Sequence, residues 1–160
     1  MKINTMILAF LLVASPALVS AAPPEGELYN YWSEPESKAF VVLGGGRYEI
    51  SGKFVAVMSY EEKPQCGNHA LIGELFDCSE MQYALAEMVE YDGNNLEISN
   101  FSNGNISKSF AQIEEDSRQE FLLIGICDEE SGKPYELEKV RKYFQMIATS
   151  LEASEQMLKR

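Results

Sequence analysis

The chain has 160 residues, of which 25 are acidic and 13 basic, giving a formal net charge of −12 at pH 7. A surface this negative repels phosphate backbones and anionic lipids, which argues against nucleic acid and anionic membrane surfaces as partners. Beyond the N-terminal segment no apolar stretch is long enough to cross a membrane, so we expect no stable membrane insertion. The length fits one domain of ordinary size with its own core.

Residues 1–22 have the three-part layout of a secretory signal peptide. Lys2 supplies a positive start, 6–14 is an uninterrupted apolar run, and 19–22 offers small residues for cleavage. The apolar run is too short for a permanent membrane anchor. We therefore predict an exported protein whose single globular domain covers 23–160, where 12 basic residues stand against 25 acidic ones, a charge of −13.

The first half of this domain has the pattern of an antiparallel meander. Residues 23–31 are rich in proline and glutamate, which predicts a loose N-terminal arm. Three short segments follow at 39–43, 47–50 and 54–60, separated by glycine-containing turns, and each is expected to be a strand. A further short strand is expected at 70–76.

The segment 78–93 (CSEMQYALAEMVEYDG) suits two structures. Its residue types favour a helix that Ser79 and Gly93 could cap. Its alternation favours a strand, broken only at Glu87 and Met88. The turn at 92–95 leads into an alternating run at 96–101, and a tight turn of this composition is typical of a hairpin, so we predict a strand.

The remaining segments complete the predicted fold. Residues 120–127 (EFLLIGIC) are apolar enough for a strand buried on both faces. Residues 134–158 predict a C-terminal amphipathic helix, with Pro134 in its first turn and an apolar stripe at helical spacing. The fold class is therefore α+β, a meander sheet of about six antiparallel strands with this helix packed on one face.

Three cysteines remain after export, Cys66, Cys78 and Cys127. An exported protein meets an oxidising compartment, so a disulfide is expected, but three thiols form at most one internal bridge. Their spacing matches no zinc site. The residues alone leave the pairing open, and the remaining thiol is either free or joins two chains in a homodimer.

Few other residues suggest chemistry, and we predict no catalytic, cofactor-binding or metal-binding residue. His69, the only histidine, is expected to be a solvated loop residue. The acidic clusters at 114–116 and 128–130 lack calcium-loop spacing and are expected to be solvated. Because aromatic residues are enriched at interfaces, Tyr29, Tyr31 and Trp32 form a candidate interaction patch, with a place in the core as the alternative.

One family resemblance rests on the order of these segments. A Leu-Phe-Asp77-Cys78 entry, an alternating run ending Glu90-Tyr91-Asp92-Gly93, a polar loop with Ser117 and an apolar segment ending in Cys127 resemble the surface-adhesin protein E family. These are small secreted proteins of Gram-negative bacteria, so the resemblance implies a location in the periplasm or at the cell surface. It also implies a curved antiparallel sheet with a helix on its concave side.

The resemblance further implies a disulfide between Cys78 and Cys127. Closing a loop of about 50 residues would stabilise the fold by roughly 3–4 kcal/mol in the chain-entropy model. Family members of this kind imply a non-enzymatic role through contact with host matrix or plasma proteins. The alternative is an acidic periplasmic inhibitor or immunity protein whose charge complements a basic toxin or enzyme. No motif supports a small enzyme or a ligand carrier.

Overall fold

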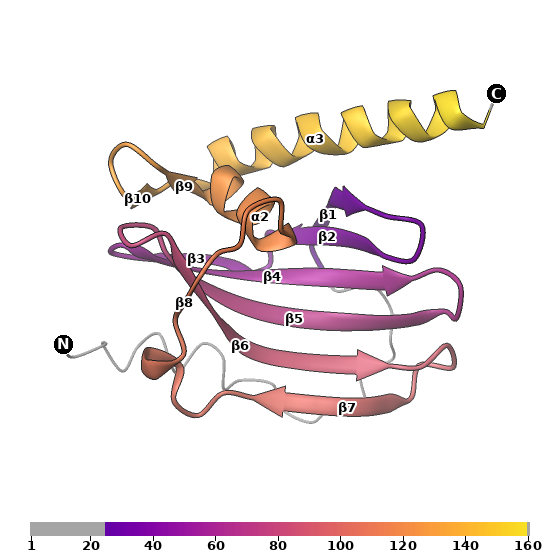
Figure 1. Ribbon diagram of the computed structural model, residues 1–160, viewed down its shortest axis with the longest axis horizontal. Helices are drawn as coiled ribbons and strands as arrows, with labels where there is room; N and C mark the ends of the chain where they lie inside the picture. The colour runs from indigo at the N-terminus through magenta and orange to yellow at the C-terminus, as the bar shows by residue number, and fades with distance from the viewer. Residues whose placement is uncertain (1–24, 160) are drawn as a thin grey trace.

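The protein consists of one antiparallel sheet with helices over part of one face (Figure 1). The computed structural model describes residues 25–159, so the predicted signal peptide at 1–22 lies outside the described residues. Among the helices of the described range, none combines the length and apolarity needed to cross a bilayer.

Eight strands form the main sheet in the order β1-β2-β4-β5-β6-β7, with β3 paired to β4 and β8 paired to β6. Every pairing is antiparallel, which confirms the predicted meander. The strands are β1 (Glu27–Ser33), β2 (Lys38–Leu43), β3 (Tyr48–Ser51), β4 (Phe54–Lys63), β5 (Asn68–Asp77), β6 (Gln82–Tyr91), β7 (Glu97–Ser102) and β8 (Ala111–Gln112).

The second part of the chain carries the helices. A 3-10 turn, η1 (Ile106–Lys108), precedes the first α-helix, α2 (Arg118–Ile126). A small hairpin of β9 (Cys127–Asp128) and β10 (Lys133–Pro134) then leads into α3 (Leu137–Leu158). Figure 1 shows both α-helices on the β1 side of the sheet, whereas β6 and β7 lie away from them.

The ambiguous segment at 78–93 is a strand, as predicted, because β6 lies between β5 and β7 and pairs with both. The hairpin turn that decided the prediction is present. Asp92 Oδ1 accepts hydrogen bonds from the backbone N–H groups of Asn94 at 2.8 Å and Leu96 at 2.9 Å, and Asn95 has a φ of 66°. Tertiary pairing therefore outweighs the helix propensity of the sequence.

The loose arm predicted at 23–31 is wrong for most of its length. β1 begins at Glu27 and pairs with β2. A register shift between Asn30 and Trp32 turns Tyr31 into the core, where it is only 2% exposed and meets Phe144 edge to face at 5.9 Å. The proline and glutamate residues near the start of the segment led to the prediction of a loose arm, although the aromatic residues that follow form a strand under α3.

The strand predicted at 120–127 is also wrong, because this segment forms α2. Ser117 caps the helix by accepting a hydrogen bond from the N–H of Glu120, which is the spacing of a capping box. Leu122, Leu123 and Ile126 are buried on one side, at helical spacing. The apolar run alone did not distinguish a buried strand from a buried helix.

The C-terminal helix is confirmed, although α3 begins at Leu137 and Pro134 belongs to β10. Val140 and Phe144 are fully buried, and Ile147 packs against the same core. α3 lies along β1 and β2, so its apolar stripe covers the sheet as expected.

Two cores lie on opposite faces of the sheet. Along β4, Val55 and Val57 join the core under the helices, whereas Ala56 joins a smaller core on the other face. This split follows from the alternation of side chains along a strand. The smaller core includes Ile106 of η1 and is flanked by Phe110.

The disulfide between Cys78 and Cys127 is present and joins the end of β5 to the end of α2. Both cysteines belong to the main core, with exposed fractions of 0% and 3%. The bridge spans 49 residues of sequence, so it ties the helical part of the chain to the middle of the sheet.

Replacing Cys78 and Cys127 together by serine should lower the free energy of unfolding by about 3–4 kcal/mol, because the unfolded chain gains the entropy of an open loop. Urea unfolding of the purified protein measures the change. Cys66→Ser is the matched control and should change nothing, since Cys66 is exposed and free. Equal stability of the double variant and the wild type would contradict this account of the bridge.

A second stability prediction concerns the contact between the two helices. A Cβ atom at Gly125 would lie 2.5 Å from Cζ of Phe144 and 2.7 Å from the ring of Tyr143. Gly125→Ala should therefore lower the free energy of unfolding by about 1–3 kcal/mol through overpacking. Ile124→Ala, at a position 52% exposed on the same helix, should stay within about 0.5 kcal/mol of the wild type. If the two variants unfold at the same urea concentration, the helices do not pack this closely.

Candidate functional site

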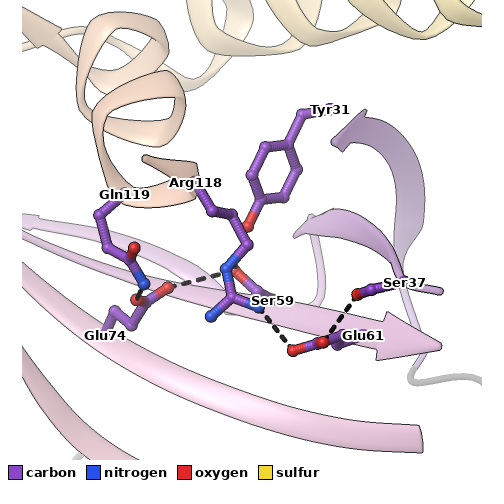
Figure 2. A network of polar contacts seen from close by, with 7 residues as sticks. All are labelled: Tyr31, Ser37, Ser59, Glu61, Glu74, Arg118 and Gln119. Atoms are coloured by element: carbon purple, nitrogen blue, oxygen red, sulfur yellow. Dashed lines mark hydrogen bonds and ion pairs between the residues drawn. The ribbon is translucent and has the colours of Figure 1, made fainter. Parts of the chain in front are cut away.

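A polar network holds the first turn of α2 against the sheet (Figure 2). Its members come from five parts of the chain, spread from residue 31 to residue 119. They are Tyr31 of β1, Ser37 before β2, Ser59 and Glu61 of β4, Glu74 of β5, and Arg118 and Gln119 of α2.

Glu74 is the most buried charged group in this network, with 2% of its surface exposed. It accepts hydrogen bonds from Nε2 of Gln119 at 3.1 Å and from Oγ of Ser59 at 3.4 Å. Burial raises the pKa of Glu74, while the nearby Arg118 guanidinium and these two hydrogen bonds oppose the rise. The carboxyl group is therefore costly to ionise where it stands, and its partners lie on both α2 and the sheet.

Arg118 supplies the second connection. Its Nη1 lies 2.6 Å from Oε2 of Glu61, with both side chains about one fifth exposed. Glu61 also accepts a hydrogen bond from Oγ of Ser37 at 2.7 Å. A half-buried ion pair with a second donor holds its geometry better than an exposed pair does.

Tyr31 closes the network on the side of β1. Its hydroxyl donates to Oγ of Ser59 at 3.5 Å, and burial, followed by the charge of Glu74, raises its pKa. In the described part of the chain no buried side-chain nitrogen or oxygen lacks a hydrogen-bond partner. The bonds of the network are thus used within the protein, and they attach the start of α2 to β4 and β5.

His69 does not lie in a solvated loop, which corrects that prediction. It belongs to β5, is 8% exposed and stacks on Tyr91 with ring centroids 5.0 Å apart. Tyr60 approaches the same imidazole ring at 5.7 Å. The histidine is therefore packed between two aromatic rings of neighbouring strands.

A shallow pocket lies where β4 and β6 end and where β5 and β7 begin. Its volume is about 40 Å³, and its lining includes Glu61, Ala70, Met88, Glu90 and Ile98. Small-molecule sites usually measure roughly 300–1,000 Å³. This pocket therefore suits the tip of one side chain rather than a metabolite.

The acidic clusters are turn elements. Asp128 Oδ1 accepts hydrogen bonds from the N–H groups of Glu130 and Ser131 in the β9–β10 turn. At the other cluster the N–H of Asp116 donates to Oε2 of Glu120 ahead of α2. Within residues 25–159, no three His, Cys, Asp or Glu side chains gather closely enough to hold a metal ion.

The structure separates the aromatic residues predicted as one interaction patch. Tyr31 is buried, so it is not part of any surface patch. Tyr29 and Trp32 are partly buried against the main core, and Trp32 meets Phe121 of α2 edge to face at 5.3 Å. Tyr31 therefore belongs to the core, which was the alternative prediction for these residues.

The three cysteines lie at two places. Cys78 and Cys127 form the bridge that the family resemblance implied. Cys66 is an exposed free thiol in the loop between β4 and β5. Of the two alternatives for Cys66, a free thiol or a link between two chains, the single chain shows the free thiol.

The surface around β7 was not singled out from the sequence. Leu96 is 64% exposed, Ile98 56% and Phe101 42%, all on β7 or directly before it. The alternating pattern at 96–101 indicated a strand, but not that this strand would be the last in the sheet. Its position follows only from the strand order.

Glu74 and Arg118 were also missed, although each left a signal. Glu74 alternates with Ala70, Ile72 and Phe76 on one face of an apolar strand, so a carboxylate had to be buried there. Arg118 follows the helix cap at Ser117, which the predicted strand at 120–127 obscured.

The raised pKa of Glu74 predicts an unusual dependence of stability on pH. The folded protein binds this proton more tightly than the unfolded chain, whose Glu titrates near the ordinary value of 4.5. The contribution is therefore fully present below about pH 4.5 and is lost as the pH rises through the folded pKa. Glu74→Gln should remove this loss and raise the free energy of unfolding at pH 7 by roughly 1–2 kcal/mol.

Urea unfolding between pH 4 and pH 8 measures this effect. Glu49→Gln is the matched control, because Glu49 is exposed on β3 and should leave the pH profile unchanged. A Glu74→Gln protein that is less stable than the wild type at pH 7 would show that the ionised carboxylate stabilises the fold.

The chain was compared with protein-family models, with curated proteins and with solved structures, and none of them matches it. The resemblance to the surface-adhesin protein E family therefore stays a prediction.

Proposed function

We propose that this chain is an exported, non-enzymatic protein-binding module that acts through contact with another protein. The observation that carries the proposal is the surface at β7, where three large apolar side chains are 42–64% exposed on or directly before a strand at the end of the sheet. Exposed apolar groups gathered in one place mark interaction sites more often than scattered ones do.

The disulfide supports the exported location. Such bridges persist in the periplasm and outside cells, and they are rare where thiols are kept reduced. The bridge between Cys78 and Cys127 fits that environment, as does the predicted signal peptide at 1–22. The resemblance to the surface-adhesin protein E family supports a location in the periplasm or at the surface of a Gram-negative bacterium, and it suggests host matrix or plasma proteins as partners.

The second candidate function is that of a periplasmic inhibitor or immunity protein directed against a basic toxin or enzyme. The charge favours it, since the predicted mature chain carries 12 basic residues against 25 acidic ones. Complementary charge raises association rates and selects partners of opposite sign. The two candidates share the binding role and differ in the location of the partner.

Affinity capture tests the proposal. The purified protein, immobilised through Cys66, is exposed in parallel to a periplasmic extract and to host serum, and retained proteins are identified by mass spectrometry. We expect at least one partner to be retained reproducibly from serum for the adhesin role, or from periplasm for the inhibitor role. Reproducible retention from neither source would contradict both roles.

Two further measurements separate the candidates. Fractionation of whole cells should find the protein accessible from outside if it is an adhesin, and only in the periplasm if it is an inhibitor. An inhibitor that uses its charge should also lose association rate steeply as the salt concentration rises. A protein found only in the cytoplasm would overturn the exported location.

A further inference from the structure

The two edge strands of the sheet, β1 and β7, differ in how far other parts of the chain cover them. β1, at one end, lies under α3 and is tied to it by Arg141, whose Nε is 2.7 Å from Oε2 of Glu27. Glu155 of α3 accepts hydrogen bonds from Ser33 at 3.0 Å and Lys38 at 2.7 Å. This end of the sheet is therefore covered and anchored.

β7, at the other end, has no further strand beside it among the described residues. Natural sheets usually protect such an edge with lysine, proline, a bulge that twists it away or a covering segment. β7 reads EISNFS and contains neither lysine nor proline. Its one irregularity lies at its start, where the register with β6 shifts between Glu97 and Ser99. The regular part of the strand, residues 99–102, thus keeps the features that allow another strand to pair.

One backbone hydrogen bond shows which groups of β7 point away from β6. The N–H of Asn103, directly after β7, donates to the carbonyl of Ala86 at 2.8 Å, so residue 103 faces β6. Alternation along an antiparallel ladder then directs Phe101 toward β6 and leaves the N–H and C=O groups of Asn100 and Ser102 on the outer edge. These groups are free to bond an added strand.

The charge of this region indicates what kind of strand fits. The β6–β7 hairpin contains Glu87, Glu90, Asp92 and Glu97 and no lysine or arginine. A second copy of the chain would bring four more carboxylates to the same edge, which opposes pairing between copies. A segment that carries positive charge is attracted instead.

We propose that β7 docks an extended, positively charged segment of a partner protein, which adds to the sheet as a further strand. The proposal rests on the proposed binding function and names the chemistry of the partner. Alternate side chains of the added strand are apolar and basic. Its apolar side chains lie on the same face of the sheet as Phe101, and its basic side chains lie on the other face, where they approach Glu97.

The shallow pocket beside β7 fits this arrangement. Met88, Glu90 and Ile98 line it together with Glu61 and Lys63, so apolar side chains stand beside two carboxylates and one ammonium group. Because the carboxylates outnumber the ammonium group, a lysine or arginine at the end of the added strand fits this pocket with its apolar stem and charged end. Backbone bonding supplies the affinity, and the carboxylates select the basic residues.

A peptide as long as β7, in which lysine and valine alternate, tests the proposal by calorimetric titration of the purified protein. Asn100→Pro should weaken binding about tenfold or more, because proline removes an outward N–H without breaking the bonds to β6. Asn100→Ala is the matched control, since it keeps the N–H, and should bind within about twofold of the wild type. A peptide with glutamate in place of lysine should not bind.

A second variant, which changes a charge on β7, tests the same proposal if Asn100→Pro fails to fold. Glu97→Lys should weaken binding about fivefold. Glu49→Lys makes the same change in net charge on exposed β3 and should weaken binding less than about 2.5-fold. Equal binding by Asn100→Pro and Asn100→Ala, or equal effects of the two charge variants, would overturn the proposal. So would dimerisation through β7 in place of peptide binding.

Failure of this proposal is distinguishable from failure of the proposed function. If partners are captured equally by the wild type and by Asn100→Pro, the protein binds partners elsewhere and only the assignment to β7 falls. If the peptide binds at β7 but no natural partner is captured from either source, the edge is competent and the proposed function falls.

Discussion

The structure depends on one geometric constraint, which is that the sheet is wider than the two helices that cover it. α3 lies along β1 and β2, and the first turn of α2 reaches β4 and β5 through side chains. The main core therefore forms under one part of the sheet, and β7 lies beyond the helices. A smaller core around Ile106 supports β6 from the opposite face. The end of the sheet with the least cover is also the end where apolar side chains remain exposed.

α2 is attached to the sheet at both of its ends by different chemistry. The disulfide of Cys127 fixes its C-terminal end to the end of β5, and Arg118 and Gln119 fix its first turn through Glu61 and Glu74. The covalent bond acts mainly by restricting the unfolded chain. The polar contacts fix the position of the first turn of α2, because hydrogen bonds to the Glu74 carboxylate form only when the donor lies at a suitable distance and angle. A short helix of nine residues would not hold its position by propensity alone.

Much of the fold was predictable from the sequence, because turns and alternation are local signals. The meander, the strand at β6 and the C-terminal helix all followed from glycine-containing turns and apolar periodicity. α2 was mistaken for a strand because a short apolar run suits both structures. β1 was mistaken for a loose arm because residues 23–31 are rich in proline and glutamate, which are depleted in strands. The pairing of Cys78 with Cys127 came from the family resemblance, since spacing alone left it open. The network around Glu74 and the open edge at β7 depend on which strands become neighbours, which is not a local property of the sequence.

Residue-resolved amide hydrogen exchange on the intact protein tests most directly the claim that the sheet is covered at one end and open at the other. The comparison uses only amides that bond within the sheet, those of β1 that pair with β2 and those of β7 that pair with β6. We predict that the β1 amides exchange about as slowly as those of β4 and β5, and that the β7 amides exchange at least about tenfold faster because their strand opens locally. Equal protection of β1 and β7 would contradict the account.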